Sequence, residues 1–168
     1  MPGDKWLDYS GQGVDELIAA ASDHRVDSIV LAFEQAVQQT TDRDHLGSLT
    51  DAEVTILAVE SLEREVNNGG YHQFFLNAPE YARFIVDSLR RIDCPRTAVI
   101  SSQAISLIGL HPPFTTEHVE AALVNDPDGK LIELLSAECD GAYFDSGEPI
   151  ADQLFAYIRA NRGAIRFG

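Results

Sequence analysis

Apolar residues recur at helical spacing along most of this chain, and glycine or proline interrupts them at short intervals. The positions of Val26, Ile29 and Phe33 predict a helix over about 24–40. Further segments with the same spacing begin near Thr50, Pro79, Pro95, Thr115, Asp126 and Ile150. No stretch alternates between apolar and polar residues as a half-buried strand would. The sequence therefore predicts an all-α fold, a compact multi-helix domain of seven to nine short helices, with antiparallel neighbours joined by short loops.

Two pairs of residues mark helix boundaries. Thr50 and Glu53 have the spacing of a capping box, in which each side chain bonds the other residue's backbone N–H. Gly69 and Gly70 predict a sharp turn, because glycine enters the left-handed region at little cost. A short helix is expected to follow this turn, over 71–76.

The domain organisation is expected to be simple, because 168 residues is an ordinary size for one globular unit. We interpret residues 1–44 as an N-terminal helical extension that packs on a core formed by residues 45–168. Near the end of the chain, Gly141 and Gly147 are expected to bracket a loop.

The sequence contains no apolar run of about 18 residues, so it predicts no transmembrane helix. Its start lacks the basic and apolar regions of a secretory signal. Two cysteines, Cys94 and Cys139, are too few for a disulfide framework. These features predict a cytoplasmic protein that has no membrane partner and whose thiols are reduced.

Charge is the second strong feature, with 27 acidic residues against 12 basic ones and a net charge of -15. Residues 61–110 are balanced, whereas both flanks are strongly acidic. Segment 117–152 has Lys130 as its only base, and its acids form the predicted partner-binding surface: Glu117, Glu120, Asp126, Asp128, Glu133, Glu138, Asp140, Asp145, Glu148 and Asp152. Such a field repels nucleic acid phosphates, so we expect a basic protein partner and no direct nucleic acid binding.

The run Glu65-Val66-Asn67-Asn68-Gly69-Gly70-Tyr71-His72-Gln73-Phe74-Phe75-Leu76-Asn77 is the most distinctive motif. It resembles the signature of the DNA-mimic-protein-19-like family, also called domain of unknown function 4375. Weaker similarity extends over roughly 45–160, including the acidic-aromatic stretch 138–144. The resemblance implies a helical, DNA-mimic-like domain over 45–168. It also implies a function, because the best-known member dimerises and occupies the DNA-binding face of a helix-turn-helix repressor.

The motif residues are expected to be mainly structural: Asn67, Asn68, Gly69, Gly70, Tyr71, Gln73, Phe74, Phe75 and Asn77. The aromatic residues fall within one turn of helix, so the helix after the glycines should be buried. The asparagines can satisfy backbone groups left unpaired at the turn. An alternative is a small-ligand site in which the side chains of Asn67, His72 and Gln73 converge.

No catalytic or metal-binding pattern is present: the five histidines are scattered, and nucleotide-binding and nucleophile motifs are absent. We therefore expect no metal, no cofactor and no enzyme activity. The favoured hypothesis is an acidic protein, with a homodimer implied by the resemblance, that mimics DNA to sequester a basic helix-turn-helix regulator. The alternatives are an immunity-type interaction module without mimicry and a small-ligand protein.

Overall fold

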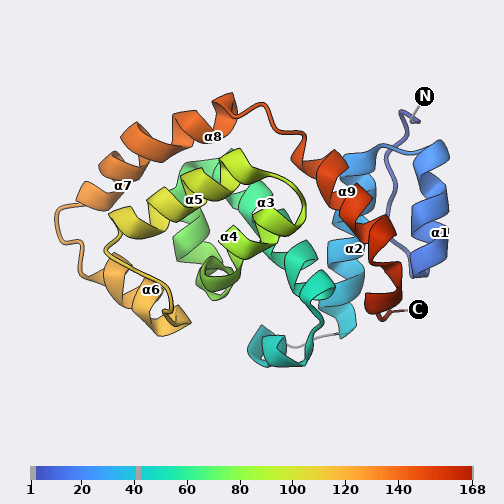
Figure 1. Cartoon of the computed structure of the whole chain (residues 1–168), viewed down its shortest axis with the longest axis horizontal. Coiled ribbons are helices and arrows are strands. Elements are labelled where there is room, and N and C mark those ends of the chain that lie inside the picture. The colour runs from blue at the N-terminus through green and yellow to red at the C-terminus, as the bar shows by residue number, and fades with distance from the viewer. Residues whose placement is uncertain (1–2, 41–42, 168) are drawn as a thin grey trace. The chain divides into compact units, whose positions relative to one another are not determined.

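The computed structural model describes residues 3–40 and 43–167, with the side chains of 43–45 left out. Residues 1, 2, 41, 42 and 168 of the two expected parts therefore lie outside the described residues. The α-helices are α1 (Val14–Ala19), α2 (Val26–Thr40), α3 (Asp51–Asn77), α4 (Ala82–Arg91), α5 (Pro95–Leu107), α6 (Thr116–Val124), α7 (Lys130–Leu135), α8 (Gly141–Asp145) and α9 (Ile150–Ala160). Over the described ranges, the only β-type pairing is an isolated bridge between Lys5 and His24. The all-α prediction is confirmed (Figure 1).

The chain divides into two compact units. One consists of Met1–Glu60 with Pro149–Gly168, and the other is Ser61–Glu148. Helix α3 supplies residues to both. The boundary that we placed at residue 44 falls inside the first unit, so an N-terminal extension ending there stays a prediction from the sequence.

In the first unit, α2 packs against α9, and α1 packs against α2 (Figure 1). The apolar residues that predicted α2 from their spacing face the interior, since Ile29 and Phe33 are fully buried. Leu154 and Ile158 of α9 are equally buried, four residues apart. Burying such side chains contributes about 2 kcal/mol each, so this pairing is a main source of the unit's stability.

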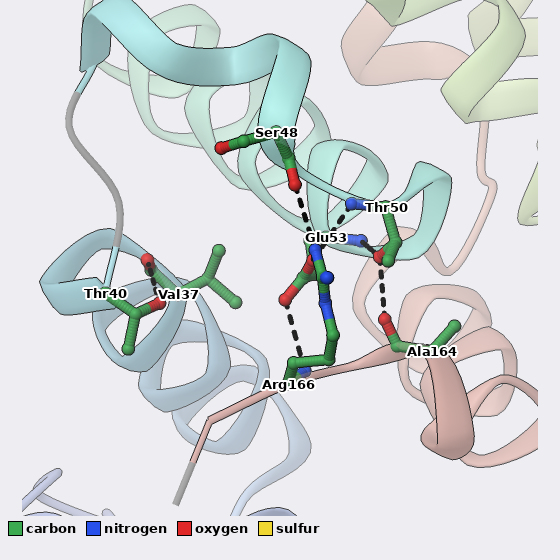
Figure 2. A network of polar contacts seen from close by, with 7 residues as sticks. All are labelled: Val37, Thr40, Ser48, Thr50, Glu53, Ala164 and Arg166. Carbon is green, nitrogen blue, oxygen red and sulfur yellow. Dashed lines mark hydrogen bonds and ion pairs between the residues drawn. The ribbon is translucent and has the colours of Figure 1, made fainter.

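A clasp of polar contacts joins the start of α3 to the C-terminal segment (Figure 2). The predicted capping box is present, with Thr50 N–H donating to Glu53 at 2.9 Å and Glu53 N–H donating to Thr50 Oγ1 at 3.1 Å. The Thr50 hydroxyl also donates to the carbonyl of Ala164 at 2.7 Å. Arg166 binds the Glu53 carboxylate through its backbone N–H and its guanidinium, both at 3.1 Å. The guanidinium also donates to the Ser48 carbonyl at 2.9 Å.

In the second unit, α4 and α5 pack together, and Pro95 opens α5 as the sequence predicts. Fully buried Ile85 and Leu89 supply the inner face of α4. Helix α6 begins at a reciprocal cap, in which Thr115 Oγ1 accepts from the His118 N–H at 3.3 Å and His118 Nδ1 accepts from the Thr115 N–H at 3.1 Å. Local sequence thus sets the helix starts in this unit.

The prediction of a loop between Gly141 and Gly147 is wrong, because Gly141–Asp145 is helical. Helix α7, a π-helical turn over Ser136–Asp140 (η4) and α8 follow one another without a break, and we call residues 130–145 the rod. The rod runs alongside α5 (Figure 1). Leu135, Cys139 and Tyr143 are the buried residues of the rod, four positions apart, and their packing keeps the chain helical through Gly141.

Candidate partner-binding surface and motif turn

The motif turn lies inside α3, at Gly69 and Gly70. Gly70 has φ 78° and ψ −176°, a backbone conformation that is essentially restricted to glycine. A Cβ added there would also overlap the carboxylate of Asp140. Two independent constraints therefore require glycine at position 70: its backbone conformation and the closeness of the Asp140 carboxylate.

The side chain of Asp140 caps the helix that follows the turn. Its Oδ1 accepts from the backbone N–H of Tyr71 at 2.9 Å, across 69 positions of sequence. We expected the motif asparagines to serve such backbone groups, but Asn67 instead donates to the carbonyl of Glu63 at 2.6 Å, and Asn68 is exposed. The π-helical turn of the rod thus supplies the group that completes the motif.

The motif aromatics are buried, as their spacing predicts: Tyr71, Phe74 and Phe75 are each at most 1% exposed. The hydroxyl of Tyr71 lies 2.7 Å from Ser101 Oγ on α5, and its ring meets that of Tyr143 edge to face at 6.0 Å. Burial raises the pKa of the Tyr71 hydroxyl far above its ordinary value. The phenol therefore stays neutral and ties α3 to α5 and the rod.

A second contact between α3 and the rod pairs Glu63 with Tyr143, whose hydroxyl donates to the Glu63 carboxylate. Burial raises the pKa of Glu63, and the hydrogen bond from Tyr143 offsets part of that rise. Nearby Cys139 is a free, buried thiol, and burial raises its pKa to about 11. A thiol in that state is a poor nucleophile, so this cluster is built for packing rather than for covalent chemistry.

The motif amides are also used within the fold. Gln73 and Asn77 both donate to Glu65 Oε2, at 2.7 and 3.0 Å. His72, which directly precedes Gln73, is half-buried. Asn67 and Gln73 thus bond different residues of α3, Glu63 and Glu65, and the small-ligand alternative stays a prediction from the sequence.

Three of the ten acids predicted to bind a partner are half-buried and bonded to backbone N–H groups. Asp140 binds Tyr71 as described, and Asp126 accepts from Lys130 and Leu131 at 3.0 and 3.1 Å, at the start of α7. Glu148 accepts from the N–H groups of Arg96 and Thr97 at 3.1 and 2.6 Å, at the start of α5. Carboxylates at helix starts stabilise the unpaired N–H groups and the helix dipole, so these three serve the fold.

The other seven acids are exposed: Glu117, Glu120, Asp128, Glu133, Glu138, Asp145 and Asp152. The first six belong to the second unit, on α6, the α6–α7 connection and the rod, whereas Asp152 lies on α9 of the first unit. Lys130 lies 3.9 Å from Asp128, and both side chains are more than 70% exposed, so this ion pair is weak. We call the six acids of the second unit the acidic surface.

A comparison with protein families identifies the chain. The model of a family described as DMP19-like protein matches residues 47–161, more than half of the sequence. The chain belongs to the DMP19-like protein family. No curated protein matches it.

The match to the DMP19-like family takes in the motif turn, the rod and all ten predicted acids, and it leaves out residues 1–46. The motif is visible in the sequence, but its partners Glu63, Ser101 and Tyr143 are not, because contacts across the fold leave no local signal. The capping role of Asp126 could be predicted from the sequence, since an aspartate just before a helix is a common cap.

Within 3–40 and 43–167, no cluster of three or more histidine, cysteine or acidic side chains could hold a metal ion. No helix in the same ranges has the length and apolar character needed to span a membrane. The acidic surface is therefore the feature with the clearest chemistry, which is attraction of cationic groups.

Proposed function

We propose that this DMP19-like protein acts without catalysis, by binding a basic partner protein in the cytoplasm. The proposed partner is a DNA-binding regulator of the helix-turn-helix class, which the acidic surface occupies in place of DNA. One observation carries the proposal: six exposed carboxylates of the second unit share their segment with a single base, Lys130. The resemblance to the DNA-mimic-protein-19-like family, whose best-known member dimerises, supports both mimicry and a homodimer as the binding form.

The chemistry of the proposal is replacement of phosphates by carboxylates. Both groups accept charge-assisted hydrogen bonds from lysine and arginine. Duplex DNA carries a charge about every 3.4 Å along each strand, and a helix with an acid every turn carries one about every 5 Å. Glu117 and Glu120 on α6 are three residues apart and have this approximate spacing, whereas Glu133 and Glu138 on the rod are five residues apart, about 7 Å along the helix axis.

The test compares two variants, each with four acidic residues neutralised, so that both have the same change in net charge. The first carries Glu117→Gln, Glu120→Gln, Glu133→Gln and Glu138→Gln. The control carries Asp4→Asn, Asp8→Asn, Glu16→Gln and Asp23→Asn, which are exposed acids of the first unit. Each protein is immobilised, cell lysate is applied at low salt, and bound proteins are eluted with salt and assayed for displacement from DNA.

We expect wild type and control to retain a DNA-binding protein that elutes with salt, and the first variant to lose it. Salt sensitivity is expected because screening shortens electrostatic attraction to about 8 Å at physiological ionic strength. Retention of the same partner by the first variant would contradict mimicry and favour an interaction module that uses the neutral middle of the chain. Failure of the protein to displace its partner from DNA would also contradict it.

A further inference from the structure

A cleft of about 360 Å³ lies within the second unit, between α4, α5 and the segment that leads from α5 to α6. Its size is at the lower end of the range for small-molecule sites. It contains neither the motif residues nor the acidic surface. The family motif and the proposed partner binding therefore leave this cleft unexplained.

The charge of the cleft is opposite to that of the chain. Arg83 and Arg90 line it from α4, and His111 lines it from the connecting segment. Asp87, between the two arginines on the same face of α4, is the only acidic residue of the lining. In a protein with a net charge of -15, this is a local excess of positive charge.

The two guanidiniums keep donors available for a ligand. Arg83 lies over the ring of Phe84, with its Cζ 4.6 Å from the ring centre, a contact that positions the group without using its N–H donors. Arg90 lies 3.6 Å from Asp87, and both side chains are more than 60% exposed, so that ion pair is weak. The pKa of Glu117 on α6 is lowered mainly by a hydrogen bond from its own backbone N–H and by the Thr115 hydroxyl, and Arg83 adds a smaller attraction, so this acid also lies near the cleft.

The rest of the lining is apolar with hydroxyl groups at its edge. Val86, Ile105, Leu110 and Phe114 supply the apolar surface, and Ser102 and Ser106 of α5 supply the hydroxyls. Ile105 and Phe114 are buried, so the inner wall is fixed by the core. A polyphosphate carries more negative charge than two arginines can neutralise, and it makes no favourable contact with an apolar wall. A hydrocarbon body with one anionic group matches both the arginine pair and the apolar wall.

We propose that this cleft binds a small organic anion, an apolar or aromatic body that carries one carboxylate. Arg83 and Arg90 hold the carboxylate, and the wall of Val86, Ile105 and Phe114 takes the apolar body. Because both arginines are exposed, added salt should weaken the binding. The proposal does not depend on the partner-binding function, since the cleft and the acidic surface are different sets of residues.

The experiment titrates the full chain with phenylacetate and follows its amide NMR spectrum. We expect saturable shifts confined to α4, α5 and the 110–114 segment, and none with the neutral analogue phenylacetamide. Arg83→Gln and Arg90→Gln should each weaken binding about tenfold, the usual worth of a charge-assisted hydrogen bond. The matched control is Arg159→Gln, which removes one exposed arginine from the first unit.

A further variant separates binding in the cleft from attraction to surface arginines. Ser106→Phe fills the cleft and keeps both guanidiniums, so it should abolish the shifts while the rest of the spectrum remains that of the folded protein. The proposal would be overturned if phenylacetamide bound as well as phenylacetate, or if either arginine variant or Ser106→Phe bound phenylacetate as tightly as wild type does. Shifts centred outside the cleft would also overturn it. The lysate experiment above neither requires nor reports on this result, so the two proposals can fail separately.

Discussion

Gly70 carries two constraints on one backbone position, a conformation that is nearly exclusive to glycine and contact with Asp140. Gly129 is a natural comparison, because its φ is also positive, at 66°, but it has the ordinary left-handed conformation, and a Cβ added there would meet nothing within 4 Å. The difference between the two positions therefore reports the restricted conformation and the Asp140 contact together, beyond the cost of an ordinary positive φ.

We predict that Gly70→Ala lowers the free energy of unfolding by about 2–4 kcal/mol, because alanine must strain the backbone and displace the carboxylate. Gly129→Ala should cost only about 1 kcal/mol. Urea unfolding of both variants and wild type measures the difference. Equal losses for the two variants would show that Asp140 adds nothing to the requirement for glycine at the motif turn.

At this scale the sequence predicted local contacts and missed distant ones. The capping box of Thr50 and Glu53 was readable because its two residues are three apart, and it is confirmed. The cap from Asp140 to Tyr71 joins positions 69 apart, so nothing near either residue announces it. The same aspartate looked like a surface acid in a sequence that is rich in them.

Among the elements, the rod shows where helix prediction fails. Gly141 suggested a loop because glycine often ends helices, yet here it continues one with ordinary helical backbone and an exposed surface. The buried line of Leu135, Cys139 and Tyr143, spaced by four, was visible in the sequence and is the stronger signal. Packing of that line against the core outweighs the modest intrinsic cost of one glycine in a helix.

The clasp at the start of α3 gives a prediction with a pH dependence. Burial raises the pKa of Glu53, but hydrogen bonds from Thr50 and Arg166 outweigh it, and the net pKa lies below the ordinary value of 4.5. A lowered pKa means that the unfolded chain takes up the proton first as pH falls. The stability from the clasp is therefore complete above pH 4.5 and is lost as pH falls through the lower, folded value.

We predict that Arg166→Gln costs about 1–2 kcal/mol at neutral pH, less than for a fully buried pair because the Arg166 side chain is 60% exposed. The loss relative to wild type should shrink in acid, where Glu53 is protonated in both proteins. Unfolding free energies from neutral pH down to about pH 3 measure this. Arg162→Gln, which breaks a pair with exposed Asp15, is the control and should change stability little at any pH. A loss that stays constant with pH would mean that Arg166 acts by packing alone.

For the whole molecule, the same negative charges have opposite effects on binding and on folding. Against a basic partner they attract, so salt weakens the complex. Within the free chain they repel one another, so salt should stabilise the fold. The six carboxylates of the acidic surface contribute to both effects. Outside this surface, Asp126, Asp140 and Glu148 are bonded to helix starts and stabilise the fold.

We predict that raising NaCl from about 0.1 to 1 M, which shortens the screening length from about 10 to 3 Å, stabilises the free protein. A gain of about 1 kcal/mol corresponds to a rise in melting temperature of about 3 °C for a chain of this length. The variant with Glu117, Glu120, Glu133 and Glu138 changed to glutamine should melt higher at low salt and gain less from salt, because part of the repulsion is already gone. Calorimetric melting of both proteins across this range decides the matter. Identical salt responses would mean that these four carboxylates are too far apart to repel, and such spacing would also be too sparse to present a DNA-like face.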